Sequence, residues 1–163
     1  MFGQGGNTFR TVVGLVKDWR PTEAYGHERE FQSELQDYLD EHLNNGGGIL
    51  DGGTYAVSTE RGASRGDVVI NDQIGIELKR DFTNSQKKKL RGQLEDYADH
   101  YDYVIACACG ISDMDGWRDL EKKVGNNGPG IGLQQTQFEF IIKREENFGT
   151  DPQDDDFLGG GLF

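Results

Sequence analysis

The stretch that decides the fold reads DVVINDQIGIELK and covers residues 67–79. Two apolar runs, 68–70 and 74–76, stand on either side of the polar tripeptide at 71–73. Short β-branched runs separated by Asn and Asp are typical of a β-hairpin. The sequence therefore predicts two antiparallel strands joined by a tight turn.

The register of this hairpin follows from its apolar residues. A turn of three residues pairs Ile70 with Ile74, and the same register places Asp67 opposite Glu77. A shift by one residue would put Asp67 opposite a core residue and break the apolar pairing, so the pattern selects this register. Residues two apart on a strand share a face, and Lys79 therefore points to the same side as Glu77.

Two opposed carboxylates beside an ammonium group suggest a metal site. Carboxylates at this distance repel each other and raise each other's pKa unless a cation lies between them. Mg²⁺ or Mn²⁺, which prefer oxygen ligands, would relieve the repulsion, and Lys79 would hold a water or a phosphate oxygen. An exposed ladder of ion pairs is the alternative, because such ladders are common on strand faces. The hairpin alone favours neither.

A helix predicted over residues 23–43 carries a further acid. Phe31, Leu35, Leu39 and His42 form its apolar stripe. Glu28 falls near the middle of that stripe at 100° per residue. A glutamate on the core side of a helix needs a partner. In the alternative interpretation, Glu28 is solvated in the first turn and complements the helix dipole.

A second helix, predicted over residues 85–101, adds an amide and a basic cluster. Gln93 flanks the stripe formed by Leu90, Leu94 and Tyr97. Its amide either orients a ligand water or a phosphate, or lies at the rim of the core. The helix begins with Lys87, Lys88, Lys89 and Arg91, which either follow a nucleic-acid backbone or are simply solvated.

The remaining segments complete an α/β pattern. We expect a loose start at 1–7, a helix at 8–19, strands at 49–59, 102–109 and 136–143, and a helix at 117–124. The strand–helix–strand crossover after the hairpin favours a mixed central sheet flanked by helices. We expect an N-terminal extension with a short helix (1–22), one domain (23–148) and a disordered acidic tail (149–163).

The charge is unevenly distributed. The chain has 29 Asp and Glu against 17 Lys and Arg, a formal net charge of −12 at pH 7. The stretch 61–91 holds eight basic and four acidic residues. One basic zone on an acidic body can steer a polyanion such as DNA. Solubility and halophilic adaptation explain the acidic remainder equally well.

Cysteine content and hydropathy point to a soluble intracellular protein. Cys107 and Cys109 alternate in the apolar run 103–109, which predicts a strand with both thiols on one face. With no other cysteine, we expect small buried side chains rather than a disulfide or a zinc site. The sequence shows no signal peptide and no apolar stretch of about 18 residues, so we expect no membrane partner.

The acidic and basic motifs resemble a known family. Gly66-Asp67, Glu77-Leu78-Lys79 and Gln93-x-x-x-Tyr97 together resemble the PD-(D/E)xK nuclease superfamily, the last being similar to its RecB-type members. Glu28-Arg29-Glu30-Phe31 and the loop 62–64 resemble archaeal Holliday junction resolvases. The resemblance covers roughly residues 26–109.

The resemblance implies a restriction-endonuclease-like fold with an αβββαβ core and a magnesium-dependent deoxyribonuclease, either resolvase-like or restriction-like. Asp67, Glu77 and the Leu78 carbonyl would ligate Mg²⁺, or Mn²⁺ in its place, and Glu28 would ligate directly or through water. Lys79 would activate the attacking water, and Gln93 would orient the site. Together with the charge pattern, it suggests DNA contacts from a set of exposed residues: Arg29, Arg61, Ser64, Arg65, Arg80, Lys87, Lys88, Lys89 and Arg91. Resolvases act as dimers, so we also consider a homodimer.

Two other functions are consistent with the sequence. One is a catalytically inactive nucleic-acid-binding member of the same fold, although the acid–acid–lysine set is intact. The other is an acidic adaptor that docks a protein partner through its tail, where Asp154-Asp155-Asp156-Phe157-Leu158 and Phe163 loosely resemble the tails of single-stranded-DNA-binding proteins.

Overall fold

The computed structural model describes residues 2–45, 55–59, 67–126 and 136–150. The helices are α1 (Phe2–Asp18), α2 (Glu28–Asp40), α3 (Lys87–Ala98) and α4 (Met114–Asn126). The strands are β1 (Val57–Thr59), β2 (Val68–Ile70), β3 (Ile74–Phe82), β4 (Tyr103–Ile111) and β5 (Gln137–Lys143). A π-helical turn, Glu41–Asn45, extends α2, and 3₁₀ turns cover Asn84–Gln86 and Glu145–Asn147.

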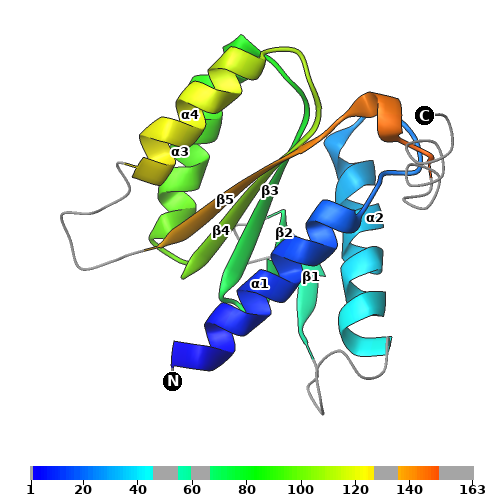
Figure 1. The fold of residues 1–163 in the computed structure, drawn as a ribbon, viewed down its shortest axis with the longest axis vertical. Coiled ribbons are helices and arrows are strands. Elements are labelled where there is room, and N and C mark those ends of the chain that lie inside the picture. Colours follow the sequence, from blue (N-terminus) through cyan, green and yellow to red (C-terminus); the bar gives the residue numbers. More distant parts are fainter. Residues whose placement is uncertain (1, 46–54, 60–66, 127–135, 151–163) are drawn as a thin grey trace, which may run out of the picture.

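The strands form one sheet in the order β1-β2-β3-β4-β5. β1, β2 and β3 pair antiparallel, whereas β3, β4 and β5 pair parallel. One core cluster joins the sheet to α1 and α2, and a second joins its other face to α3 and α4 (Figure 1). The prediction of an α/β fold with a mixed sheet flanked by helices is confirmed.

The hairpin of β2 and β3 has the register that the sequence predicts. Val68 pairs with Ile76, and Ile70 pairs with Ile74. In the turn, Asn71 and Asp72 have φ angles of 53° and 55°. Asn and Asp adopt this left-handed conformation more readily than other non-glycine residues, which suits them to this turn.

Helix α1 begins earlier than the sequence suggests. The glycine-rich start was expected to be loose, but the helix runs from Phe2. Phe9 stacks on Tyr103 of β4 with ring centroids 4.6 Å apart, and Val12 and Val16 are fully buried against the sheet and α2. Packing on the sheet stabilises this helix despite its glycines, so the segment expected as an extension contributes to the core.

Helix α2 begins at Glu28, five residues later than expected, because Glu34 holds the preceding segment in another conformation. Its carboxylate accepts hydrogen bonds from Trp19 Nε1 (2.8 Å), Thr22 Oγ1 (2.6 Å) and the Tyr25 hydroxyl (2.6 Å). Burial acts to raise the pKa of Glu34, but these hydrogen bonds outweigh it and lower that pKa below its ordinary value. Phe31, Leu35 and Leu39 of the predicted stripe are buried, whereas His42 lies in the turn after α2 and is half-buried.

The other boundaries lie near the predicted ones. Of the strand expected at 49–59, the structure shows β1 at 57–59, and 49–54 lie outside the described residues, as does the tail from 151. Cys107 and Cys109 are buried free thiols, as expected. No described helix combines the length and apolar character needed to span a bilayer.

Candidate metal and phosphodiester site

Asp67, Glu77 and Lys79 come together on the face of the sheet that α3 covers. Asp67 directly precedes β2, and the other two lie on β3. Their exposed fractions are 8%, 2% and 6%. A ladder of surface ion pairs would be solvated, so this degree of burial excludes that alternative.

The hydrogen bonds of the cluster fix both carboxyl groups. Asp67 Oδ2 accepts a hydrogen bond from the Leu78 amide at 2.8 Å. Glu77 Oε1 lies 3.1 Å from Lys79 Nζ, and Glu77 Oε2 accepts a hydrogen bond from the Tyr97 hydroxyl of α3. A backbone amide thus fixes Asp67, and a buried hydroxyl fixes Glu77. The two carboxyl groups are therefore already oriented without a ligand.

The proximity of the two acids changes the titration of Asp67. Burial first, and the charge of Glu77 second, raise the pKa of Asp67 to about 8 from its ordinary value of 3.8. Asp67 also shares a hydrogen bond with Glu77. At neutral pH the metal-free pair therefore holds a proton, in the place where a cation would remove the same repulsion.

The donor set fits a magnesium ion that keeps part of its water shell. Two residues of a hydrogen-bonded strand pair exchange both backbone bonds, so the N–H and C=O of one residue point the same way. The Leu78 carbonyl therefore points to the side where its amide meets Asp67. In the described part of the chain, no group of three or more His, Cys, Asp or Glu side chains is placed to hold a metal. Two carboxylates, a carbonyl and waters suit Mg²⁺.

Glu28 does not join the pair, contrary to the expectation of a metal ligand. Its Oε2 accepts a hydrogen bond from the Arg80 amide at 3.2 Å. The Arg80 side chain turns away and donates through Nε to the Tyr25 carbonyl at 2.9 Å. The reason lies in the layers: α2 and α3 pack on opposite faces of the sheet, so Glu28 reaches β3 from the side opposite Lys79.

Gln93 carries a buried acceptor that needs a donor. It lies one helical turn before Tyr97 on α3, and its Oε1 is buried with no hydrogen-bond partner among the described residues. An unsatisfied buried acceptor costs about 1–3 kcal/mol, so a donor from a bound water or ligand is expected there. Gln86, two turns earlier on the same side as Gln93, already has a donor, because its amide oxygen accepts a hydrogen bond from the Thr83 backbone N–H.

Tyr97 is a site residue that the sequence placed in the apolar stripe and in the Gln93-x-x-x-Tyr97 motif, without a role of its own in the site. It is buried, and its hydroxyl donates to Glu77. The available signal was the Gln93-x-x-x-Tyr97 spacing, which puts both side chains on one face of α3. The hydroxyl group, rather than the ring, is what this position adds to the cluster.

Three of the predicted DNA-binding residues meet in a pocket between α3 and α4. Lys87, Lys88 and Arg91 line it together with Asn84, Leu120 and Lys123, and its volume is about 290 Å³. Asp119 pairs with Lys87 and, at 3.0 Å, with Lys123. Lys123 was not among the sequence candidates, because its distance in sequence hides its proximity to α3.

The other predicted DNA contacts are scattered. Arg29 on α2, Arg80 on β3 and Lys89 on α3 are exposed. The remaining three, Arg61, Ser64 and Arg65, lie outside the described residues.

Comparisons with family models, with curated proteins and with solved structures found no match for this chain. Function is therefore inferred from the geometry of Asp67, Glu77, Lys79 and Tyr97.

Proposed function

We propose that this protein is a divalent-metal-dependent nuclease of the PD-(D/E)xK type that hydrolyses phosphodiester bonds in DNA. The observation that carries the proposal is the buried pair of opposed acids, Asp67 and Glu77, with the Lys79 ammonium 3.1 Å from Glu77. Burying two carboxylates and an ammonium is costly, and structural stability alone gives little reason for it.

The chain's own groups divide the work. Asp67, Glu77 and the Leu78 carbonyl would hold Mg²⁺, which supplies Lewis-acid activation and neutralises charge on the phosphate. Lys79 donates a hydrogen bond to the attacking water or to a non-bridging phosphate oxygen. Tyr97 keeps Glu77 oriented, and the Gln93 oxygen accepts a hydrogen bond from the attacking water.

The reaction is a single displacement at phosphorus. The oxygen of water bonds to phosphorus while the bond to the 3′ oxygen breaks. The water loses a proton and the departing 3′ oxygen gains one, which leaves a 5′-phosphate and a 3′-hydroxyl. The cationic pocket between α3 and α4 is lined by the first turns of α3 and would bind phosphates that flank the cut.

The test compares cutting and metal binding in the same variants. Purified protein is incubated with duplex, single-stranded and four-way-junction DNA, with Mg²⁺, Mn²⁺ or EDTA, at low and at molar salt. We expect metal-dependent cutting that Asp67→Asn and Lys79→Met abolish. Glu30→Gln, which changes an exposed carboxylate of α2, should retain it.

Mn²⁺ binding measured by calorimetry gives a second readout. We expect it to be lost in Asp67→Asn and retained in Glu30→Gln. DNA binding without cutting under every condition would support an inactive DNA-binding protein instead. If the protein binds neither metal nor DNA, the nuclease assignment is refuted, and an acidic adaptor that docks a protein partner becomes the favoured function.

A further inference from the structure

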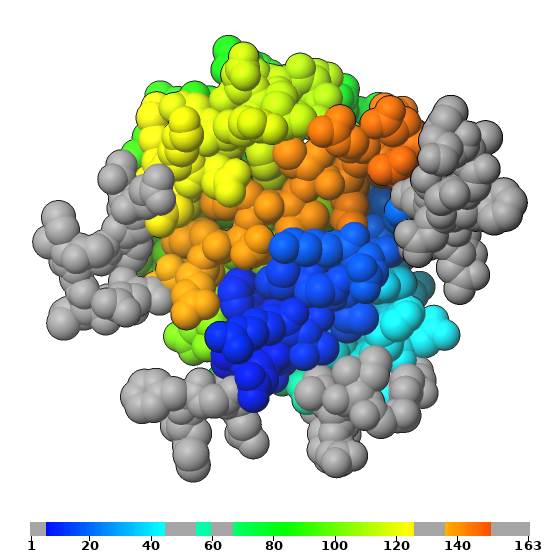
Figure 2. Space-filling view, viewed as in Figure 1, coloured from blue at the N-terminus to red at the C-terminus, as the bar shows by residue number. Residues whose placement is uncertain are grey.

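A second cationic pocket, of about 210 Å³, lies where the end of α1 meets the end of β5. Lys17 and Arg20 line it from α1 and the residues after it, and Lys143 and Arg144 from β5 and the residue after it. Asn147 and Phe148 close one side. Figure 2 shows α1 in blue lying against β5 in orange on this face of the molecule.

Four cations in one pocket are unusual in a chain with a net charge of −12. Two of them have weak partners: Lys17 Nζ lies 3.5 Å from Glu139, and Arg144 lies 3.9 Å from Glu146. Both pairs are solvated, and such pairs contribute about 0–1 kcal/mol. These two pairs therefore offset little of the charge of Lys17 and Arg144.

Lys143 is the buried member of the group, with an exposed fraction of 7%. Its Nζ donates to the Lys17 carbonyl at 2.5 Å, which satisfies one of the unpaired carbonyls in the last turn of α1. An ammonium has three donors, and within the described part of the chain only this one is used. Burial lowers the pKa of Lys143, a sign that its charge is incompletely compensated.

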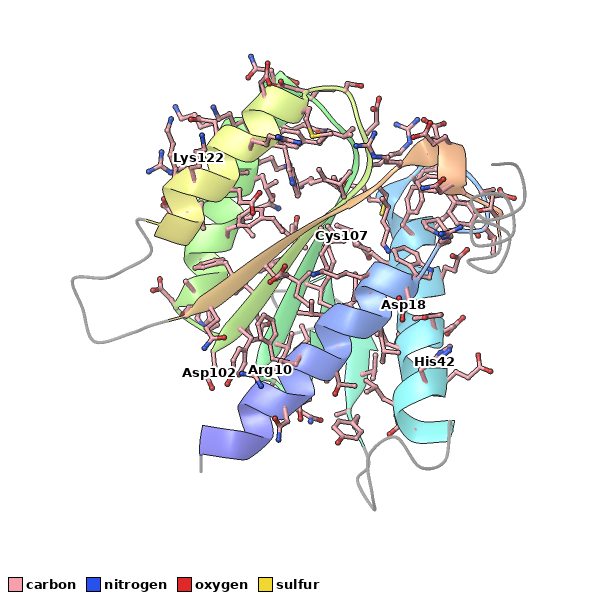
Figure 3. All side chains as sticks on the ribbon, viewed as in Figure 1. Arg10, Asp18, His42, Asp102, Cys107 and Lys122 are labelled. Carbon is pink, nitrogen blue, oxygen red and sulfur yellow. The ribbon has the colours of Figure 1, made fainter. Side chains whose placement is uncertain are left out.

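The neighbours of Lys143 in the sheet offer no counter-charge. Lys143 pairs with Cys109 on the neighbouring strand β4. Cys107 lies two residues before Cys109 on the same face, near the middle of the sheet (Figure 3). Burial first, then the neighbouring thiol, raises the pKa of Cys109 well above its ordinary value, so this thiol is neutral. The charge of Asp18 acts to raise the pKa of Lys143, and the charge of Arg20 acts to lower it.

We propose that this pocket is a binding site for a phosphate group. A phosphate dianion would accept hydrogen bonds from the Lys143 ammonium and from the Arg20 guanidinium, whose Nη1 also donates to the Thr150 hydroxyl at 2.8 Å. Such charge-assisted bonds are about twice as strong as neutral ones. Lys17 and Arg144 stand at its margin. The site is separate from Asp67 and Glu77, which face α3, and does not depend on the proposed nuclease activity.

Calorimetry on the full chain in phosphate-free, low-salt buffer tests the site. The probes are inorganic phosphate, a short oligonucleotide with a 5′-phosphate, and the same oligonucleotide with a 5′-hydroxyl. We expect saturable phosphate binding that weakens at least tenfold in Lys143→Met and in Arg20→Gln. Lys122→Met, which changes an exposed lysine of α4 outside this pocket (Figure 3), should bind phosphate as the wild type does.

The oligonucleotides identify the source of the phosphate. Tighter binding of the 5′-phosphate form, lost in Arg20→Gln but kept in Asp67→Asn, would assign the pocket to nucleic-acid ends. Equal binding of both oligonucleotides, with inorganic phosphate still bound, would assign it to a small free anion. A phosphate-dependent rise in Tm, absent in Lys143→Met even if that variant is itself more stable, is the second readout. No saturable binding, or equal binding in all variants, would overturn the proposal.

Discussion

At the residue scale, Asp67 links stability to metal binding through one proton. The folded, metal-free protein holds a proton on Asp67 up to pH of about 8, whereas an ordinary aspartate loses it near 3.8. Between these values the folded state binds more protons than the unfolded state, so this group makes stability fall as pH rises. Metal binding must displace the same proton, so metal affinity rises with pH over the same interval.

Asp67→Asn should separate these two effects. The asparagine stays neutral and keeps an oxygen for the Leu78 amide, so the metal-free variant should be more stable than wild type at pH 8, and the difference should shrink as pH falls toward 5. Each kcal/mol corresponds to about 2–4 °C in Tm for a chain of this size. Thermal unfolding of both proteins from pH 5 to 8 measures this difference in stability. A variant that melts below wild type at pH 8 would contradict the shared proton.

Tyr97→Phe should weaken catalysis more than stability. The change removes the hydroxyl that orients Glu77 but leaves the buried ring. The free energy of unfolding should therefore fall by only about 1–3 kcal/mol. Groups that orient a metal ligand typically contribute about 10–100-fold to metal affinity or activity. Titration of the cutting rate with Mg²⁺ tests this. Tyr103→Phe, whose ring stacks on Phe9 of α1, is the matched control.

At the element scale, β3 organises the molecule because it pairs antiparallel with β2 and parallel with β4. Gly75 on this strand faces Tyr101, which follows α3. A Cβ at Gly75 would lie 2.6 Å from Tyr101 Cδ2, so no side chain fits between strand and ring. The glycine lets the end of α3 approach the sheet beside Glu77.

Gly75→Ala should therefore destabilise the protein. Inserting a methyl into a packed core costs about 1–3 kcal/mol, and the Tyr101 ring would have to move. Gly92→Ala is the matched control, because nothing lies within 4 Å of a Cβ at that position on α3. At position 92 the helical preference of alanine should raise the free energy of unfolding by about 0.5–1 kcal/mol. Chemical denaturation measures the free energy of unfolding of both variants. Equal changes in the two would show that the Tyr101 ring moves aside without cost.

Some of these elements could be predicted from sequence and others could not. The hairpin register depends on residues close in sequence, and the alternation of Val68, Ile70 and Ile76 was sufficient to predict it. The start of α2 depends on a carboxylate that binds Trp19 and Thr22, and no periodicity shows this. For the same reason, the sequence placed Glu28 on the correct helix but could not show which face of the sheet it meets.

At the scale of the whole molecule, positive charge collects in two pockets of an acidic protein. Lys88 belongs to the pocket between α3 and α4, and Lys122 is an exposed lysine on α4 outside that lining. If phosphates bind in this pocket, Lys88→Ala should reduce the slope of log affinity against log salt by about one for DNA. Lys122→Ala should leave it unchanged. Identical slopes, measured by anisotropy, would place the DNA elsewhere.

The bond between Asp67 and the Leu78 amide joins residues only eleven positions apart. A hairpin forms within about 1–10 μs, faster than the strand crossovers that add β4 and β5. We therefore expect the two acids to meet early in folding, while water still screens their repulsion, and to lose that water when α3 docks. We expect proton uptake by Asp67 to accompany the docking of α3, so the pH dependence of the refolding rate should report on closure of the core over the acids.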